Sequence, residues 1–116
     1  MADLSVDLGR VSLKNPVIPA SGTFGYGTEF WELYDLNLLG AIAVKGTTRL
    51  PRSGNPGPRV AETPSGLLNS VGLQNPGIET VLSRELPELR KHFKNPIILN
   101  VSGFCAEDYA YCCARA

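Results

Sequence analysis

The sequence predicts a parallel α/β fold that follows an N-terminal β-hairpin. Three short apolar segments have the pattern of buried strands, and segments with helical periodicity separate them, which is typical of a parallel sheet covered by helices. Each of these strands ends in small or polar residues, in the order ASG, KGTT and NVSG. Ligands of parallel α/β folds bind at the carboxyl ends of the strands, so we expect the three clusters to line one edge of the sheet.

The N-terminal segment predicts the hairpin and the first strand. Apolar and polar residues alternate on both sides of Gly9-Arg10, which indicates a β-hairpin with one buried face. The alternating apolar residues are Leu4, Val6, Leu8, Val11 and Leu13. The apolar run at 17–20 does not alternate, so we expect a strand that is buried on both faces, as in a parallel sheet.

A helix and a second strand are expected next. Thr28 is a suitable N-cap for a helix over 29–40, and Gly40 is a suitable stop. Phe30, Trp31, Leu33 and Tyr34 would form its apolar face. The run at 41–46 predicts the second buried strand.

A long polar segment, 47–77, follows the second strand and is rich in Pro, Gly, Asn and Ser. Within it, 59–63 and 66–70 flank a Pro-Ser turn and could pair as a second hairpin. Its last nine residues, NSVGLQNPG, have two interpretations. They form either a tight structural turn, the commoner use of residues such as Asn69 and Asn75, or a loop whose amides and backbone N–H groups face a small ligand.

The C-terminal part predicts an amphipathic helix over 78–93, a third buried strand at 96–103 and a further helix from Ala106. Pro87 should kink or restart the first of these helices near Leu86. Three parallel strands would leave an open sheet edge. We therefore expect residues 1–116 to be the N-terminal, incomplete portion of one larger barrel domain.

Composition excludes several classes of protein. Eleven basic and eleven acidic residues among 116 give a formal net charge of zero, so a nucleic-acid or acidic-membrane partner is not expected. The sequence contains neither a signal peptide pattern nor an apolar run of the roughly 20 residues that span a bilayer. Three cysteines, two of them adjacent, match neither a disulfide framework nor a metal motif, which predicts a cytoplasmic protein.

Few side chains are candidates for chemistry. Lys45 ends an apolar strand and either reaches solvent at the rim or faces an anionic ligand or an electron-rich ring. Asn100 interrupts another apolar strand. It is either a core amide whose hydrogen bonds are satisfied within the protein or a contact to a ligand. The spacing of SGTFGYG matches neither the dinucleotide fingerprint nor the P-loop. His92 is interpreted as a helix-end cation, and Cys105 as the most reactive thiol, although Glu107 and Asp108 oppose this.

Four motifs, taken together, resemble a known family. NPVIPASGTFG, GAIAVKGTT, GNPGPRVAETPSGLLNSVGLQNPG and PIILNVSG, in this order and spacing, are similar to the N-terminal third of dihydroorotate dehydrogenase. The resemblance extends from about Leu4 to Arg115. Its most specific element is NSVGL, and the continuation QNPG resembles the NAD-linked class 1B more than the fumarate-linked class 1A, which remains the alternative.

The resemblance implies a (β/α)8 TIM barrel that holds FMN and oxidises dihydroorotate to orotate in pyrimidine synthesis. The residues it implies for flavin contact are Ala20, Ser21, Gly22, Lys45, Gly46 and Asn100. The residues it implies for binding dihydroorotate or orotate are Lys45, Asn69, Ser70, Val71, Gly72 and Leu73. It also implies a homodimer and a partner subunit that carries FAD and an iron-sulfur cluster and passes electrons to NAD.

Parts of the family's site have no counterpart in this sequence. The catalytic base of class 1 enzymes is a cysteine on a loop after the fourth strand, and neither Cys105, Cys112 nor Cys113 matches that position. The phosphate-binding loops of such barrels also lie beyond the three predicted strands. We therefore expect no catalytic residue within 1–116 and no activity from these residues alone. A non-catalytic half-barrel that serves as a binding module is the remaining alternative.

Overall fold

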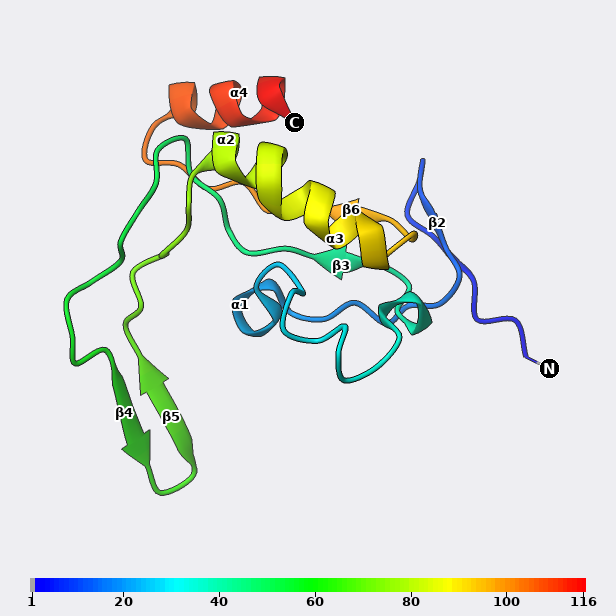
Figure 1. The fold of residues 1–116 in the computed structure, drawn as a ribbon, viewed down its shortest axis with the longest axis horizontal. Helices are drawn as coiled ribbons and strands as arrows, with labels where there is room; N and C mark the ends of the chain where they lie inside the picture. Colours follow the sequence, from blue (N-terminus) through cyan, green and yellow to red (C-terminus); the bar gives the residue numbers. More distant parts are fainter. Residues whose placement is uncertain (1) are drawn as a thin grey trace.

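A parallel strand pair forms the centre of the structure, a computed structural model that describes residues 2–116 (Figure 1). β3 (Ile42–Ala43) pairs in parallel with β6 (Ile97–Ile98), and the register places Ile42 opposite Ile97. A parallel bridge between Thr47 and Val101 continues the pairing toward the carboxyl ends of both strands. The predicted parallel arrangement of these two strands is therefore confirmed. Ile98 is exposed, however, so the prediction of a buried strand at 96–103 is wrong at this residue.

The N-terminal segment contains the antiparallel pair β1 (Val6–Asp7) and β2 (Ser12–Leu13). Only one of its five alternating apolar residues, Leu13, is buried. The predicted buried face is thus wrong for this part of the chain. The residues of that face that are exposed are Leu4, Leu8 and Val11.

The predicted strand at 17–20 does not form. Its backbone groups bond to neighbouring loops, since the Val17 N–H donates to the Asn15 side chain and the Gly40 N–H donates to the Val17 carbonyl. Pro19, inside the run, and Pro16, directly before it, have no N–H to donate to a ladder. Val17 is exposed, so burial on both faces is also wrong.

The predicted helix at 29–40 is also wrong, and shorter elements replace it. α1 (Ser21–Phe24) ends at Gly25, whose φ of 58° breaks the helical path. Isolated turns follow, and the ring of Phe30 stacks on that of Phe24 with centroids 4.3 Å apart. The 3-10 helix η1 (Leu36–Leu38) is capped by Asp35, which accepts a hydrogen bond from the Asn37 N–H, and not by Thr28.

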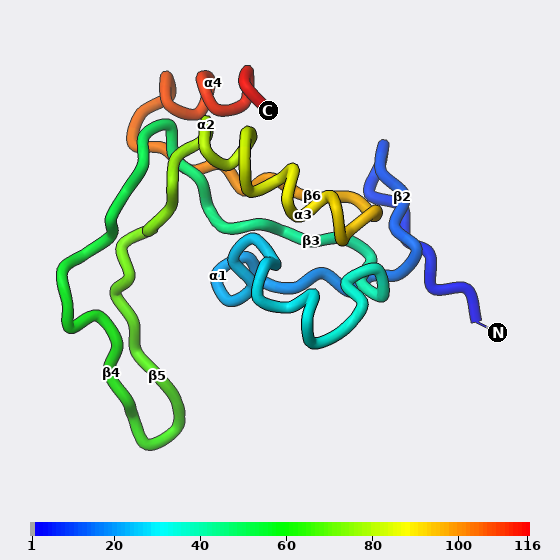
Figure 2. The backbone as a smooth tube through the Cα atoms, in the orientation of Figure 1, coloured from blue at the N-terminus to red at the C-terminus, as the bar shows by residue number. Residues whose placement is uncertain are grey.

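An arm projects away from the central strands. β4 (Val60–Thr63) and β5 (Gly66–Asn69) form the second hairpin that the sequence predicts. The segments that lead into and out of the arm run side by side (Figure 2). Backbone hydrogen bonds join them at Arg52 with Asn75, from Asn55 to Val71 and from Ser70 to Arg59.

A long interrupted helix covers the central strands. It comprises α2 (Ile78–Thr80), the π-helical turn η2 (Val81–Glu85) and α3 (Leu86–His92). Pro87 lacks an N–H group, and the helix does restart at Leu86, where the Leu86 N–H donates to the Val81 carbonyl across the wider turn.

The last element, α4 (Ala106–Arg115), packs beside α2. Glu79 accepts hydrogen bonds from the Tyr111 hydroxyl at 2.9 Å and from two nitrogens of Arg115 at 2.9 and 2.8 Å. The Arg115 hydrogen bonds, followed by the Tyr111 bond, lower the pKa of Glu79 to about 2. This ion pair therefore links the two helices throughout the neutral range.

The core lies between β3 and the helix above it. Its buried residues are Phe24, Leu36, Leu39, Ile42, Val44, Leu89 and Phe93. Leu89 and Phe93 come from the predicted apolar face of the 78–93 helix, which confirms that periodicity. Within residues 2–116, no helix is long and apolar enough to cross a membrane.

Candidate functional site

Three of the predicted flavin contacts meet at the carboxyl ends of β3 and β6. The Asn100 side chain donates a hydrogen bond from Nδ2 to Ser21 Oγ at 3.1 Å, which joins the end of β6 to the start of α1. Gly46 lies beside them, because a Cβ atom built there would stand 3.7 Å from Asn100 Nδ2 and 3.2 Å from Ser102 Oγ. The alternation of strands and loops thus brings Ser21, Gly46 and Asn100 together across a sequence separation of 79 residues.

Asn100 therefore has a polar partner, but a single donated hydrogen bond does not satisfy a primary amide. A primary amide has two N–H donors and one oxygen acceptor, and the only hydrogen bond of this side chain among the described residues is the one to Ser21. The side chain is half-buried. The carbonyl oxygen is consequently available to solvent or to a ligand at this edge.

Lys45 is held by its backbone and free at its side chain. The Lys45 N–H donates to the Gly25 carbonyl at 2.8 Å, and the Lys45 carbonyl accepts from Thr47 Oγ1 at 3.0 Å. Within the described part of the chain, the ammonium makes no hydrogen bond and no ion pair, although the residue is half-buried. A cation at the end of an apolar strand with no protein partner can bind an anion without first breaking an internal salt bridge.

The loop after the arm reaches the same cluster through Leu73. Its φ of 56° makes it the only non-glycine residue with positive φ among residues 2–116. A Cβ on Gly46 would stand 2.9 Å from Leu73 Cδ1, so this side chain packs directly over the glycine. Left-handed backbone at a bulky residue costs of order 1–3 kcal/mol and persists only where surrounding contacts impose it.

The contacts that impose this conformation come from the base of the arm. Gly72 has a φ of 79°, and a Cβ there would approach the Asn55 backbone nitrogen to 2.8 Å. The Asn55 N–H donates to the Val71 carbonyl at 3.0 Å, and its side chain donates to the Ser70 carbonyl at 2.8 Å. The predicted substrate loop, residues 69–73, is therefore hydrogen-bonded to Asn55 on the opposite side of the arm.

Sequence reasoning missed Arg59, which organises the same region. Its guanidinium donates to the Asn55 carbonyl at 3.1 Å and to Gln74 Oε1 at 2.9 Å, and so bridges the two sides of the arm. The signal in the sequence was an arginine within a turn-rich segment, GNPGPR, where an extended charged side chain can reach several free carbonyls.

The two asparagines of the nine-residue segment have different surroundings. Asn75 is buried, accepts hydrogen bonds from the N–H groups of Thr48 and Gly77, and donates to the Leu73 carbonyl. It is a structural residue, as the turn interpretation predicts. Asn69 is exposed on the arm, and its side chain makes no hydrogen bond within residues 2–116. Leu73 thus contacts the Ser21–Asn100 cluster through Gly46, whereas Asn69 is the last residue of β5 on the projecting hairpin.

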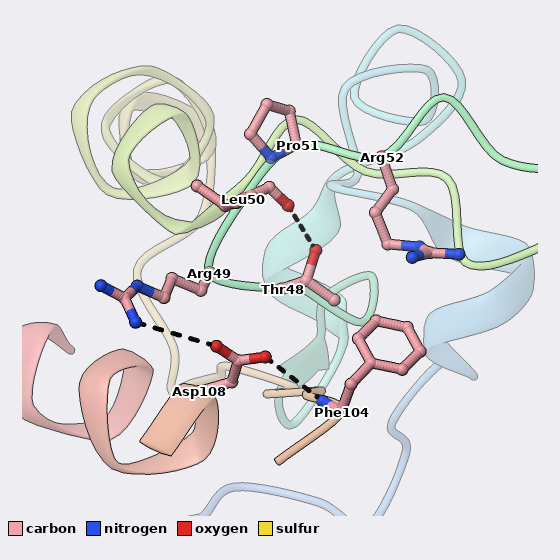
Figure 3. A pocket seen from close by; sticks show the side chains of 7 residues that line it. All are labelled: Thr48, Arg49, Leu50, Pro51, Arg52, Phe104 and Asp108. Carbon is pink, nitrogen blue, oxygen red and sulfur yellow. Dashed lines mark hydrogen bonds and ion pairs between the residues drawn. The ribbon is translucent and has the colours of Figure 1, made fainter. Parts of the chain in front are cut away.

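Concavities of about 220, 260 and 350 Å³ lie among the described residues, and none is lined by a predicted flavin residue. One, of about 260 Å³, lies between the loop that follows β3 and the start of α4 (Figure 3). The side chains that line it include Arg49, Arg52 and Asp108, and the Arg52 guanidinium lies 4.6 Å from the ring centre of Phe104. None of the predicted flavin residues lines it. We favour the Ser21–Asn100 cluster because its groups face the strand ends, where ligands of parallel folds bind.

The remaining titratable candidates have structural surroundings. The His92 ring stacks on Trp31 with centroids 4.1 Å apart, which adds a packing role at the end of α3. Cys112 is fully buried, as a packed thiol should be. The Asp108 backbone amide lowers the pKa of Cys105, but Glu107 and the nearby negative charge outweigh it, so the pKa is raised. The expectation that Cys105 forms a thiolate readily is therefore wrong. Residues 2–116 contain no cluster of side chains suited to a metal ion.

Comparison with known proteins identifies the family. A family model described as dihydroorotate dehydrogenase matches residues 3–116. The chain belongs to this family. The resemblance that the four sequence motifs indicate is thus confirmed over nearly the whole chain.

The curated relatives include several bacterial proteins with one name. The chain is 56% identical over 112 residues to the dihydroorotate dehydrogenase B (NAD(+)) catalytic subunit of Enterococcus faecalis, which covers 97% of this chain and 36% of that protein. It is 60% identical over 109 residues to the protein of the same name from Bacillus thuringiensis, covering 94% and 35%. The chain therefore spans about a third of the length of these relatives.

A solved structure has a similar fold. The crystal structure of DHODH from Eimeria tenella in complex with ferulenol superposes with a TM-score of 0.59 and 23% sequence identity. The match covers 87% of this chain and 29% of that one. At this identity the likeness concerns the fold, and it agrees with an α/β segment of a dihydroorotate dehydrogenase domain.

Proposed function

We propose that this chain supplies the first strands, the isoalloxazine-facing residues and the substrate loop of an FMN-dependent dihydroorotate dehydrogenase of the NAD-linked B type. The complete domain would be a TIM barrel, and the reaction would be the oxidation of dihydroorotate to orotate. The observation that carries the proposal is the meeting of Ser21, Gly46 and Asn100 at one sheet edge with an unpaired Lys45 beside them. The B-type names of the relatives favour the NAD-linked subclass over the fumarate-linked one.

The residues at this edge fit a flat, polar cofactor ring. Because Gly46 has no side chain, Leu73 and Ser102 approach its backbone closely, which brings the substrate loop to the edge where the ring would lie. Ala20 and Gly22, two of the smallest residues, flank Ser21. The Asn100 amide oxygen accepts no hydrogen bond from the described residues. A flavin bound here would supply the hydride acceptor for the oxidation.

The substrate would lie between Lys45 and the loop at 69–73. The Lys45 ammonium would pair with the substrate carboxylate and hold positive charge near the flavin, which favours electron uptake. Backbone N–H groups of Val71–Leu73 and the Asn69 amide would complete the polar contacts, and the Ser70 N–H would join them only if it leaves the Arg59 carbonyl to which it now donates. Asn69 lies on the projecting hairpin in the present structure, so this role requires the arm to approach the bound substrate.

The same proposal includes the wider assembly. The words "catalytic subunit" in the names of the relatives support a separate electron-transfer subunit, which we expect to carry FAD and an iron-sulfur cluster. A homodimer of the catalytic chain and a cytoplasmic location are also part of this proposal. The three cysteines, all free thiols in the structure, agree with a reducing compartment.

Lys45→Ala tests the function in the complete gene product that contains this sequence. A charge-assisted hydrogen bond contributes about 1.5–3 kcal/mol, so orotate affinity, measured by perturbation of the flavin spectrum, should fall roughly 10- to 150-fold. Lys45→Met, which keeps the apolar stem, separates loss of charge from loss of packing. Lys91→Ala is the matched control, because Lys91 pairs only with Glu88 on an exposed helix surface. Unchanged orotate affinity in both Lys45 variants would refute the proposal.

A further inference from the structure

The backbone around Lys45 is clamped from both directions. Its N–H donates to the carbonyl of Gly25 at 2.8 Å, which ties the strand end to the turn after α1. Its carbonyl accepts the hydroxyl proton of Thr47 at 3.0 Å. These two bonds limit rotation of both peptide planes that flank the Lys45 Cα, and hence the direction in which the side chain leaves the backbone.

Thr47 is itself rigidly placed. It is fully buried, its N–H donates to the Asn100 carbonyl at 2.8 Å, and its carbonyl accepts from the Ser102 N–H at 2.8 Å. These are the bonds of the parallel bridge that extends β3 and β6. These bonds fix the backbone of Thr47, and the position of its hydroxyl is therefore set by the strand.

The second partner of that hydroxyl is Tyr26. Tyr26 Oη lies 3.4 Å from Thr47 Oγ1, at the long end of hydrogen-bond range. The Thr47 proton points to Lys45, so Tyr26 must be the donor in this contact. Gly25 and Gly27, with φ values of 58° and 80°, form the tight turn that holds Tyr26 between them. A tyrosine hydroxyl is protonated at neutral pH, and burial raises the pKa of Tyr26 further.

We propose that Tyr26 is a positioning residue for Lys45, which it controls through the hydroxyl of Thr47 and through the Gly25 carbonyl of its own turn. The inference rests on the proposed function, since it assigns Tyr26 a role in orotate binding only through the Lys45 ammonium. It also gives the glycine-rich SGTFGYG segment a purpose beyond contact with the flavin: the turn aligns the end of β3.

Two measurements on the complete gene product test this proposal, with Tyr26→Phe and Thr47→Val as the variants. The first is hydrogen exchange of peptides that span Val44–Thr47. One neutral hydrogen bond contributes about 0.5–1.5 kcal/mol, so exchange at these amides should accelerate roughly 2- to 12-fold in each variant. Tyr34→Phe is the matched control, because the Tyr34 hydroxyl makes no hydrogen bond among the described residues.

The second measurement is orotate affinity in a double-mutant cycle with Lys45→Ala. Tyr26→Phe should weaken orotate binding about 2- to 12-fold when Lys45 is present and have no further effect when it is absent. A general structural role would weaken binding equally in both backgrounds, and that result would overturn the proposal. Unchanged exchange across Val44–Thr47 in Tyr26→Phe would also overturn it.

The outcomes separate this inference from the proposed function. If Lys45→Ala leaves orotate affinity unchanged, the proposed function fails whatever Tyr26→Phe does. If Lys45→Ala weakens binding and Tyr26→Phe does not, the proposed function stands and the positioning role is refuted.

Discussion

The segment NSVGLQNPG contains two asparagines, and the structure predicts a large loss of stability on substitution of Asn75 and almost none at Asn69. Asn75 makes four side-chain hydrogen bonds: it accepts from the N–H groups of Thr48 and Gly77, and it donates to the Leu73 carbonyl and to Thr48 Oγ1. All lie between 2.9 and 3.1 Å, and Asn75 is only 5% exposed. At about 1 kcal/mol net for each bond, Asn75→Ala should lower the free energy of unfolding by on the order of 3–4 kcal/mol.

Urea unfolding of the complete gene product, followed by circular dichroism, measures this loss. The midpoint should fall by on the order of 1 M with little change in slope. If Asn75→Ala does not fold, Thr48→Val gives a milder form of the test, because it removes the hydroxyl that accepts from Asn75 Nδ2 and leaves the other three bonds of Asn75 in place. Asn69→Ala is the control, and a change within about 0.5 kcal/mol is expected at this exposed site. Equal effects at Asn69 and Asn75 would refute the reasoning.

Three further predictions concern the site and the chain. Asn69→Leu should weaken orotate binding without lowering flavin content; if orotate binds as before, Asn69 is only a hairpin residue. Limited alkylation followed by mass spectrometry should label Cys113 well before Cys112, because one is exposed and its neighbour is fully buried, and equal rates would contradict the burial of Cys112. Residues 1–116 alone should retain no FMN after desalting and should not oxidise dihydroorotate. Exposed apolar residues such as Leu67, Leu68 and Phe104 lack cover, and ligand contacts of about 1 kcal/mol each do not offset the cost of immobilising a free ligand, about 4 kcal/mol or more. A yellow, active monomer would contradict this prediction.

Local patterns predicted the elements whose partners are close in sequence. The arm hairpin formed where a Pro-Ser turn separates two short segments, and the helical period at 78–93 identified Leu89 and Phe93 as core residues. The parallel pairing of β3 with β6 followed from two apolar runs with a helix between them. The hairpin and helix signals are strong because each depends on residues close together in the chain. The β3–β6 pairing joins residues far apart in the sequence, and it was inferred from the order of strands and helices.

The failures occurred where local bonds replaced the expected regular structure. At 17–20 the apolar run predicts a strand, but Pro16 and Pro19 lack the N–H groups that a strand ladder needs. At 29–40 the aromatic residues suggested a helix face, whereas Phe30 instead stacks on Phe24 within a series of turns. Periodicity predicts neither outcome. The first follows from the position of the prolines, and the second depends on the contact between Phe30 and Phe24.

The candidate site was predictable in its residues more than in its arrangement. The sequence shows a charge at Lys45 and an amide at Asn100, each at the end of an apolar strand, where such groups need polar partners. The left-handed conformation of Leu73 and the clamp from Tyr26 through Thr47 were not, because both depend on how distant loops meet. The distinction between Asn69 and Asn75 likewise required the structure.

Anaerobic titration with dihydroorotate tests the central claim most directly. The complete gene product would be purified, its flavin identified by mass spectrometry after release, and its visible absorbance followed as dihydroorotate is added. The account predicts bound FMN whose absorbance near the flavin maximum bleaches on addition of dihydroorotate, with loss of this response at low substrate in Lys45→Ala. A protein that holds no flavin, or a bound flavin that dihydroorotate leaves fully oxidised, would contradict it.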